Sequence, residues 1–164
     1  MQVEEIIIAD SSPLIGLARI NQLELLHQLA KRTVVPAAVW SESVTARPDA
    51  PGANLLFATS WIEIQPLDFP LPASLLAEVD RGEAEAITLA QRFPEAVLLL
   101  DDLRARRVAG RHGLRLLGTV GLLVRARKAG ILSALRPAMD QLVAVGIHLN
   151  PELVRAALAE VGEV

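Results

Sequence analysis

The stretch "EIIIAD SSPLIGLARI", residues 5–20, decides the fold because it changes from strand to helix at a single acid. Three isoleucines precede Asp10, and β-branched residues of this kind favour a buried strand. After the two serines the apolar residues recur three and four positions apart, which predicts a helix. Asp10 therefore stands at a strand-to-helix junction, where it either caps the helix or forms the first part of a metal site.

The composition of the 164-residue chain fits a layered α/β protein. Hydrophobic residues make up 52% and aromatic residues only 3%, so the core must be aliphatic, as buried parallel strands are. Charged residues interrupt every apolar run before the roughly 18 residues that a membrane span needs, so we expect no membrane partner. Cysteine is absent, which excludes thiol catalysis and a disulfide scaffold and suits the reducing cytoplasm.

Further aliphatic runs follow the first one at intervals, with helix-like segments between them. They read "RTVVP" (32–36), "WIEIQP" (61–66), "AVLLL" (96–100) and "LRLLG" (114–118). This β-α-β order predicts a three-layer α/β/α sandwich with a central, mainly parallel sheet. We expect a single domain over residues 1–164, in which residues 131–164 form a helical C-terminal extension packed on the rest.

Acids follow two of the predicted strands directly. Asp10 ends the first strand, and Asp101 and Asp102 end "AVLLL"; Glu42 lies in the helix after the second strand, and Glu83 opens the helix "GEAEAITLA". The carboxyl ends of parallel strands meet at one edge, where α/β proteins bind ligands. Each acid alone could cap a helix, which is worth about 1 kcal/mol. Several carboxylates at one edge would repel one another unless a cation neutralised them, and Mg²⁺ or Mn²⁺ prefers oxygen ligands.

The net charge of −3 conceals a basic segment. Residues 103–139 contain no Asp or Glu but nine Arg or Lys side chains. Arg104, Arg106 and Arg107 follow the acid pair and are suited to phosphate oxygens, which dominate nucleic-acid affinity; a solvated helix face is the alternative. Thr119 follows another predicted strand, where it either holds a water or phosphate or caps a helix.

Other α/β proteins with acids at strand ends fit less well. Phosphatases of the haloacid dehalogenase type need Asp-x-Asp-x-Thr after the first strand, whereas this chain reads Asp-Ser-Ser-Pro-Leu from Asp10. Receiver domains have an early acid pair and a later lysine, and here the pair comes late. Neither of the glycine-rich loops that bind nucleotides, Gly-x-x-x-x-Gly-Lys-Ser/Thr and Gly-x-Gly-x-x-Gly, occurs in the sequence.

The three histidines lack the spacing of metal ligands, so any general base would be one of the acids.

The ordered set of motifs resembles the PIN-domain proteins, a nuclease fold shared by many prokaryotic toxin ribonucleases. The matching blocks are "IAD SSPLIGLA" (8–18), "VVPAAVWSE" (34–42), "GEAEAITLA" (82–90), "LLLDDLRARRVA" (98–109) and "GLRLLGTVGLLVRARKAG" (113–130). Asp10 matches the family's first acid and Glu42 its second. Glu83 stands where the better-known toxin branch has Asp, and Asp101 with Asp102 occupies the last acidic block.

This resemblance implies a metal-dependent endoribonuclease, the toxin half of a toxin–antitoxin pair, that uses Mg²⁺ or Mn²⁺. The catalytic acids would be Asp10, Glu42, Glu83, Asp101 and Asp102, with all of these except Glu42 as metal ligands. Arg104, Arg106, Arg107 and Thr119 would contact RNA. The implied partners are RNA, a second copy of the chain and a small antitoxin, in the cytoplasm. The alternative is a PIN-like scaffold that binds RNA or protein with little or no cleavage, in which the acids cap helices.

Overall fold

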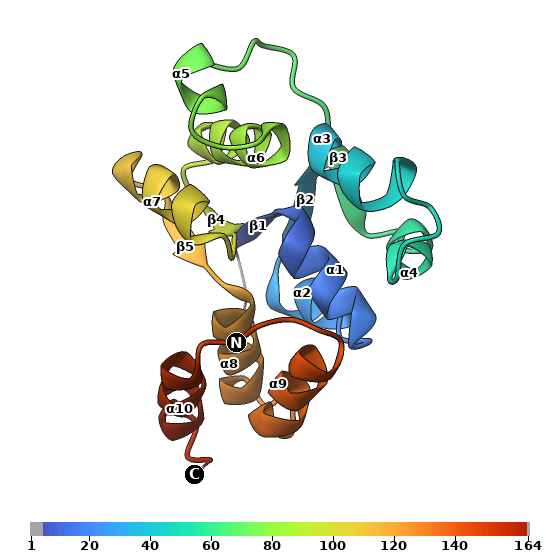
Figure 1. Cartoon of the computed structure of the whole chain (residues 1–164), viewed down its shortest axis with the longest axis vertical. Helices are drawn as coiled ribbons and strands as arrows, with labels where there is room; N and C mark the ends of the chain where they lie inside the picture. Colours follow the sequence, from blue (N-terminus) through green and yellow to red (C-terminus); the bar gives the residue numbers. More distant parts are fainter. Residues whose placement is uncertain (1–4, 164) are drawn as a thin grey trace.

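The computed structural model describes residues 5–163, which form an α/β/α fold around a five-stranded sheet (Figure 1). The strands are β1 (Ile6–Ala9), β2 (Arg32–Pro36), β3 (Ile62–Gln65), β4 (Ala96–Leu99) and β5 (Arg115–Leu117). Neighbouring strands are parallel throughout, in the order β3-β2-β1-β4-β5. The predicted fold class is confirmed, and each predicted aliphatic run contains one strand. Residues 1–4 and 164 of the predicted domain lie outside the described residues.

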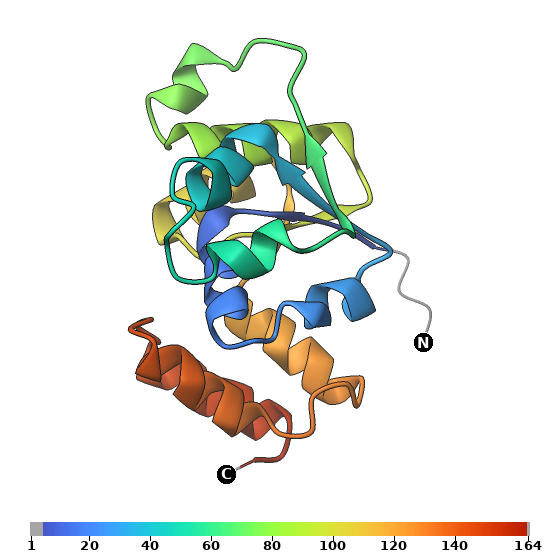
Figure 2. The same cartoon turned by 90° about the vertical axis from the view of Figure 1, so that its right-hand side faces the viewer.

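Helices cover both faces of this sheet (Figures 1 and 2). One face is covered by α1 (Ser11–Arg19), α2 (Glu24–Leu29), α4 (Ala53–Phe57) and α8 (Thr119–Lys128). The other face is covered by α5 (Ala73–Leu76), α6 (Arg81–Arg92) and α7 (Leu103–Arg111). Between β2 and α4 the chain forms the short helix α3 (Ala37–Trp40), which continues into the π-helical turn η1 (Ser41–Thr45).

Strand β1 contributes to the cores on both faces. Side chains alternate along a strand, so Ile7 and Ala9 pack against the α1 side while Ile6 and Ile8 pack against the α6 side. All four residues are buried. A central parallel strand that is covered on both faces must be apolar at every position, which explains the isoleucine run.

The direction of strand addition reverses next to β1. The chain builds β1, β2 and β3 in one direction with helices on the first face, and then returns through α5 and α6 on the opposite face to β4 and β5. Because crossover connections between parallel strands are right-handed, strands that are added in opposite directions have their connecting helices on opposite faces of the sheet. The order therefore reverses between β1 and β4, and α/β folds bind ligands at the carboxyl ends of the strands at such a point. Asp10 and Asp101 follow these two strands.

The last two helices, α9 (Leu135–Ala144) and α10 (Pro151–Glu160), lie beyond α8 at one end of the molecule (Figure 2). Leu142 and Leu158 are buried in the same core as α1 and α8. The Glu163 carboxylate accepts a 2.7 Å hydrogen bond from the Leu135 N–H, which ties the end of α10 to the start of α9. Within residues 5–163, no helix is both long and apolar enough to cross a bilayer.

The segment after β2 differs in detail from the predicted helix. Its first turn is α-helical, but Ser41–Thr45 widens into η1. The Ser43 hydroxyl donates a 2.8 Å hydrogen bond to the Val39 carbonyl and so stabilises the junction between the two turns. Single π turns inside helices are frequent at functional sites. Here the wider turn carries Glu42.

Candidate active site

Asp10 is held at the end of β1 by its own backbone. Its N–H donates a 3.0 Å hydrogen bond to the Leu99 carbonyl, which continues the β1–β4 pairing one residue beyond the strand. Asp10 also occupies the N-cap position of α1, yet in the described part of the chain its carboxylate caps no helix N–H. The side chain is only 5% exposed. Burial of an acid without the capping contact is not explained by helix stability alone.

Other acids surround Asp10 closely enough to change its ionisation. Burial is the main cause that raises the pKa of Asp10 to about 7, and the charges of Asp80, Glu42 and Asp101 raise it further. The backbone N–H of Ser11 opposes this shift. The neighbouring acids therefore add to an effect that comes mainly from burial, and they concentrate carboxylates around Asp10.

Asp101 is oriented by the start of α8. Its Oδ1 accepts the Thr119 N–H at 2.8 Å, and its Oδ2 accepts the Thr119 hydroxyl at 2.5 Å. A Cβ on Gly118 would lie 3.1 Å from Asp101 Oδ1, so the glycine leaves room for this carboxylate. Arg106, from α7, donates a 2.7 Å hydrogen bond to the Leu100 carbonyl beneath it. The side chains of Thr119 and Arg106 therefore contact the site's own framework, and their contact with RNA stays a prediction.

Asp102 has a different partner from its neighbour Asp101 and lines the cavity beside Glu83. It caps α7 through a 2.8 Å hydrogen bond from the Ala105 N–H to Asp102 Oδ1. Asp101, in contrast, is among the charges that raise the pKa of Asp10. Asp101 is thus held by the start of α8, whereas Asp102 is held by the start of α7.

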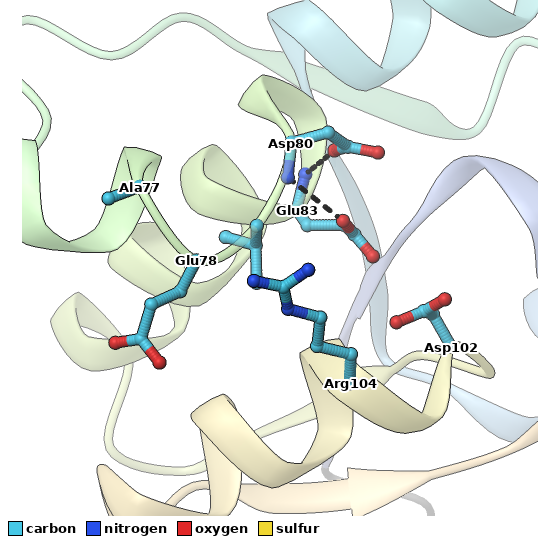
Figure 3. Close-up of a pocket in the computed structure, with 7 residues that line it drawn as sticks. Ala77, Glu78, Asp80, Glu83, Asp102 and Arg104 are labelled. Atoms are coloured by element: carbon cyan, nitrogen blue, oxygen red, sulfur yellow. Dashed lines mark hydrogen bonds between the residues drawn. The ribbon is translucent and has the colours of Figure 1, made fainter.

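Glu83 and Asp80 hold each other at the start of α6 (Figure 3). Asp80 Oδ1 accepts the Glu83 N–H at 2.8 Å, and Glu83 Oε1 accepts the Asp80 N–H at 3.0 Å. Burial raises the pKa of Glu83 to about 7, and the charges of Asp80 and Asp10 add to the shift. Asp80 was absent from the predicted site. The signal that could have found it is the spacing Asp-x-x-Glu, which is typical of a capping box.

Glu42 reaches the site from η1 and lies against Gly82 of α6. A Cβ at Gly82 would stand 2.6 Å from Glu42 Oε1 and 2.9 Å from Oε2, so only glycine admits this approach. Burial and the charge of Asp80 raise the pKa of Glu42, while a hydrogen bond from the Gly82 backbone and the charge of Arg47 lower it. The structure thus brings Asp10, Glu42, Glu83 and Asp101 to one edge of the sheet.

A cavity of about 320 Å³ opens beside these acids (Figure 3). Its walls come from the segment before α6 and from the start of α7; the lining residues are Ala77, Glu78, Val79, Asp80, Glu83, Asp102 and Arg104. Arg104 brings a positive charge to a mainly acidic wall. Arg107 is exposed on the same helix, and Arg111 forms an ion pair with Glu78.

The donor set fits a hard divalent ion in its chemistry. Every candidate ligand is a carboxylate oxygen, which Mg²⁺ and Mn²⁺ prefer, and the charges of neighbouring acids add to the burial that raises the pKa of Asp10 and Glu83. Across residues 5–163, however, no three acid or histidine side chains are already placed to hold an ion together. Asp10 makes no capping bond, whereas Glu83, Asp101 and Asp102 accept hydrogen bonds that an ion would have to share.

Comparison with known proteins agrees with this architecture. A family model described as "DUF3368: PIN domain" matches residues 6–163. The fold is similar to that of a solved PilT N-terminus domain protein from the hyperthermophilic archaeon Sulfolobus solfataricus P2, with a TM-score of 0.55 and 17% sequence identity. The similarity covers 74% of this chain and 92% of that one. At this identity the likeness concerns the fold. No curated protein matches the sequence.

Proposed function

Because this chain belongs to the PIN-domain family DUF3368, a branch of a nuclease superfamily, we propose that it is a metal-dependent endoribonuclease that hydrolyses RNA phosphodiester bonds. The observation that carries the proposal is the meeting of Asp10 and Asp101 at the ends of the adjacent strands β1 and β4. A single acid at a strand end is common. Here two acids meet where the order of strands reverses, between β1 and β4, and Glu42 and Glu83 lie beside them. This arrangement is typical of a reaction centre.

In this proposal Asp10, Glu83 and Asp101 hold a divalent ion, and Asp102 contributes from the α7 side. PIN domains generally use divalent metal ions, and Mg²⁺ or Mn²⁺ suits these oxygen ligands. When bound, such an ion lowers the pKa of a water molecule and stabilises charge on the phosphate. Asp101 is favoured over Asp102 as the closer ligand because it acts on the pKa of Asp10, whereas Asp102 caps α7.

Glu42 is our candidate for the group that accepts a proton from the attacking water. It is exposed, and η1 places its carboxylate at the site, against the Gly82 backbone at the start of α6. The pKa of Glu42 is raised toward the pH at which the protein works, and a general base is most effective when its pKa lies near that pH. Arg104 and Arg107, exposed on α7 next to the cavity, are suited to the phosphates that flank the cleaved bond.

We extend the proposal to the protein's partners, because the resemblance implies them. The chain would act in the cytoplasm as a toxin, as a homodimer, and its acidic edge would receive a segment of a small antitoxin. We place the contact with a second copy on α9 and α10, where Val143 and Leu153 are exposed. Expression of the wild-type chain should arrest growth, whereas Asp10→Asn should not, and light scattering of the pure protein should give the mass of a dimer.

Cleavage of a mixed pool of structured and unstructured RNAs tests the activity. We expect cleavage with Mg²⁺ or Mn²⁺, none in EDTA, and loss in Asp10→Asn, which keeps the size of the side chain and removes its charge. Asp140→Asn, an exposed acid on α9, is the matched control and should cleave like the wild type. Cleavage that persists in EDTA or in Asp10→Asn would contradict the proposal.

A binding protein is the second candidate function, and one observation favours it. Asp80, Glu83 and Asp102 all accept helix-capping hydrogen bonds, so these three acids have a structural use without any metal. A PIN-like scaffold of this kind would bind RNA or a protein through α7 and cleave nothing. Binding of the RNA pool with unchanged RNA length at every metal concentration would support it over the nuclease.

A further inference from the structure

We propose that Glu85 is a positioning residue that holds Glu42 at the site through the start of α3. Glu85 lies on α6, whereas Glu42 belongs to η1, far away in sequence. The inference rests on the proposed function, because it concerns the placement of the acid to which we assign the proton transfer. It adds a residue whose charge contributes to the raised pKa of Glu42 but which touches neither substrate nor metal in the proposed reaction.

The Glu85 carboxylate is buried and makes one directed contact with α3. Its side chain is 7% exposed, and its Oε1 accepts the Ala38 N–H at 3.0 Å. The first N–H groups of a helix have no partner inside that helix, so this bond satisfies a group that would otherwise be left free. Oε2 lies 3.3 Å from Arg81 Nε, whose side chain is mostly exposed. Burial of a carboxylate costs free energy unless the group is paired, so the bond to Ala38 and the ion pair with Arg81 are what stabilise Glu85 in this place.

Two contacts with α6 fix the segment that carries Glu42. At its start the Ala38 N–H is bonded to Glu85, and at η1 the Glu42 carboxylate lies on Gly82. Val39, between these points, is fully buried and prevents the segment from moving as a free loop. In Figure 1, α3 lies against one end of α6, as this arrangement requires.

Loss of the first contact should free the start of α3 to shift relative to α6, and the rest of the short segment should shift with it. The carboxylate of Glu42 would then leave its place over Gly82, although Glu42 itself is unchanged. A displacement of about 1 Å can reduce the rate of a catalysed reaction by on the order of 100-fold. RNA affinity should remain, because the arginines of α7 are on another element.

Three variants separate positioning from simple stabilisation. Glu85→Ala removes the acceptor for the Ala38 N–H, whereas Glu85→Gln keeps an oxygen in the same place and loses the charge. Thr88→Ala is the matched control, since Thr88 is buried on the same helix and its hydroxyl donates to the Ala84 carbonyl of that helix. Each protein is checked by thermal unfolding before use. If Glu85→Ala does not fold, Glu85→Met, which keeps the length of the side chain and removes the acceptor, takes its place in both measurements.

The first readout is amide hydrogen exchange over residues 37–45 in metal-free protein. We expect faster exchange there in Glu85→Ala and wild-type exchange in Glu85→Gln and Thr88→Ala. The second is single-turnover cleavage with saturating RNA, where we expect a roughly ten- to 100-fold slower reaction in Glu85→Ala, with RNA affinity unchanged. Rescue by Glu85→Gln would show that the hydrogen bond, and not the charge, matters.

Either of two results would overturn the inference. One is unchanged exchange over residues 37–45 in Glu85→Ala; the other is faster exchange with cleavage equal to that of the wild type. An inert wild-type protein would instead contradict the nuclease proposal. The exchange data would then still decide whether Glu85 holds the segment that carries Glu42.

Discussion

The Asp101 carboxylate accepts two hydrogen bonds from Thr119, one from its N–H at 2.8 Å and one from its hydroxyl at 2.5 Å. These residues follow the neighbouring strands β4 and β5, so the end of one strand orients the acid of the other. The orientation brings Asp101 within electrostatic reach of Asp10. The site is therefore arranged by contacts between strand ends as well as by the strands themselves.

Thr119→Val should slow RNA cleavage because it removes the hydroxyl that holds Asp101 Oδ2. The N–H bond to Oδ1 remains, so we expect about a tenfold loss and not a complete one. Thr119→Ser keeps the hydroxyl and is the control. Single-turnover cleavage checks both variants, and equal rates in Thr119→Val and wild type would show that this hydrogen bond does not serve the reaction.

Gly82→Ala should displace Glu42, because the new Cβ would lie 2.6 Å from Glu42 Oε1. We expect a loss of cleavage at least as large as that of Glu42→Gln. Gly110→Ala, in α7, is the matched control, because a Cβ there would meet no atom within 4 Å outside its own helix backbone. It should cleave normally and gain about 0.5–1 kcal/mol of stability from the better helix former. Normal cleavage in Gly82→Ala would mean that Glu42 does not need this position.

The stability of metal-free protein should fall as the pH rises from about 4 to about 7. The pKa of Asp10 is raised from 3.8 in the unfolded chain to about 7 in the folded protein, so the folded state binds the proton more tightly over this range. Glu83 acts in the same direction. Asp10→Asn removes the cost of the buried charge, and its free energy of unfolding should exceed that of the wild type by about 1–3 kcal/mol at pH 8.

Denaturant unfolding at pH 4.5 and pH 8 measures this difference. At the lower pH the Asp10 carboxyl is protonated in the folded protein, so variant and wild type should be nearly equal. Asp140→Asn, a change at an exposed position, keeps Asp10 and should follow the stability of the wild type at both pH values. The same gap between Asp10→Asn and wild type at both values would refute the assignment of the raised pKa to Asp10.

Arg104→Ala and Arg107→Ala should weaken RNA binding, because both side chains are exposed on α7 near the cavity. Each lost phosphate contact should reduce the slope of log affinity against log salt by about 0.7, the value for single strands. Arg155→Ala, exposed on α10 away from the site, is the control and should leave the slope unchanged. Filter binding at several salt concentrations checks this. A slope unchanged in both α7 variants would place the RNA elsewhere.

The sheet was predictable from the sequence because the central strands are aliphatic runs and β3 alternates apolar with polar residues, each between turn or cap residues. Parallel pairing then sends Asp10 and Asp101 to one edge without any knowledge of side-chain contacts. The choice between Asp101 and Asp102 was not predictable, because it depends on Thr119, whose bond to Asp101 forms only when β5 and α8 are in place.

Asp80 and η1 escaped prediction for different reasons. Asp80 reads as an ordinary helix cap, and its nearness to Asp10 arises only from the packing of α6 beside β1. The residues of η1 suit an α-helix equally well in sequence. Their wider turn is a tertiary feature that accompanies the contact of Glu42 with Gly82.

Mn²⁺ binding, measured beside RNA cleavage in wild type and Asp10→Asn, tests the central claim most directly. Paramagnetic resonance of free Mn²⁺ gives the affinity, and the same samples give the cleavage rate. We predict that the wild type binds Mn²⁺ and cleaves RNA, and that Asp10→Asn loses both together. Cleavage by the wild type without bound metal, or equal Mn²⁺ binding and cleavage in Asp10→Asn, would contradict the account.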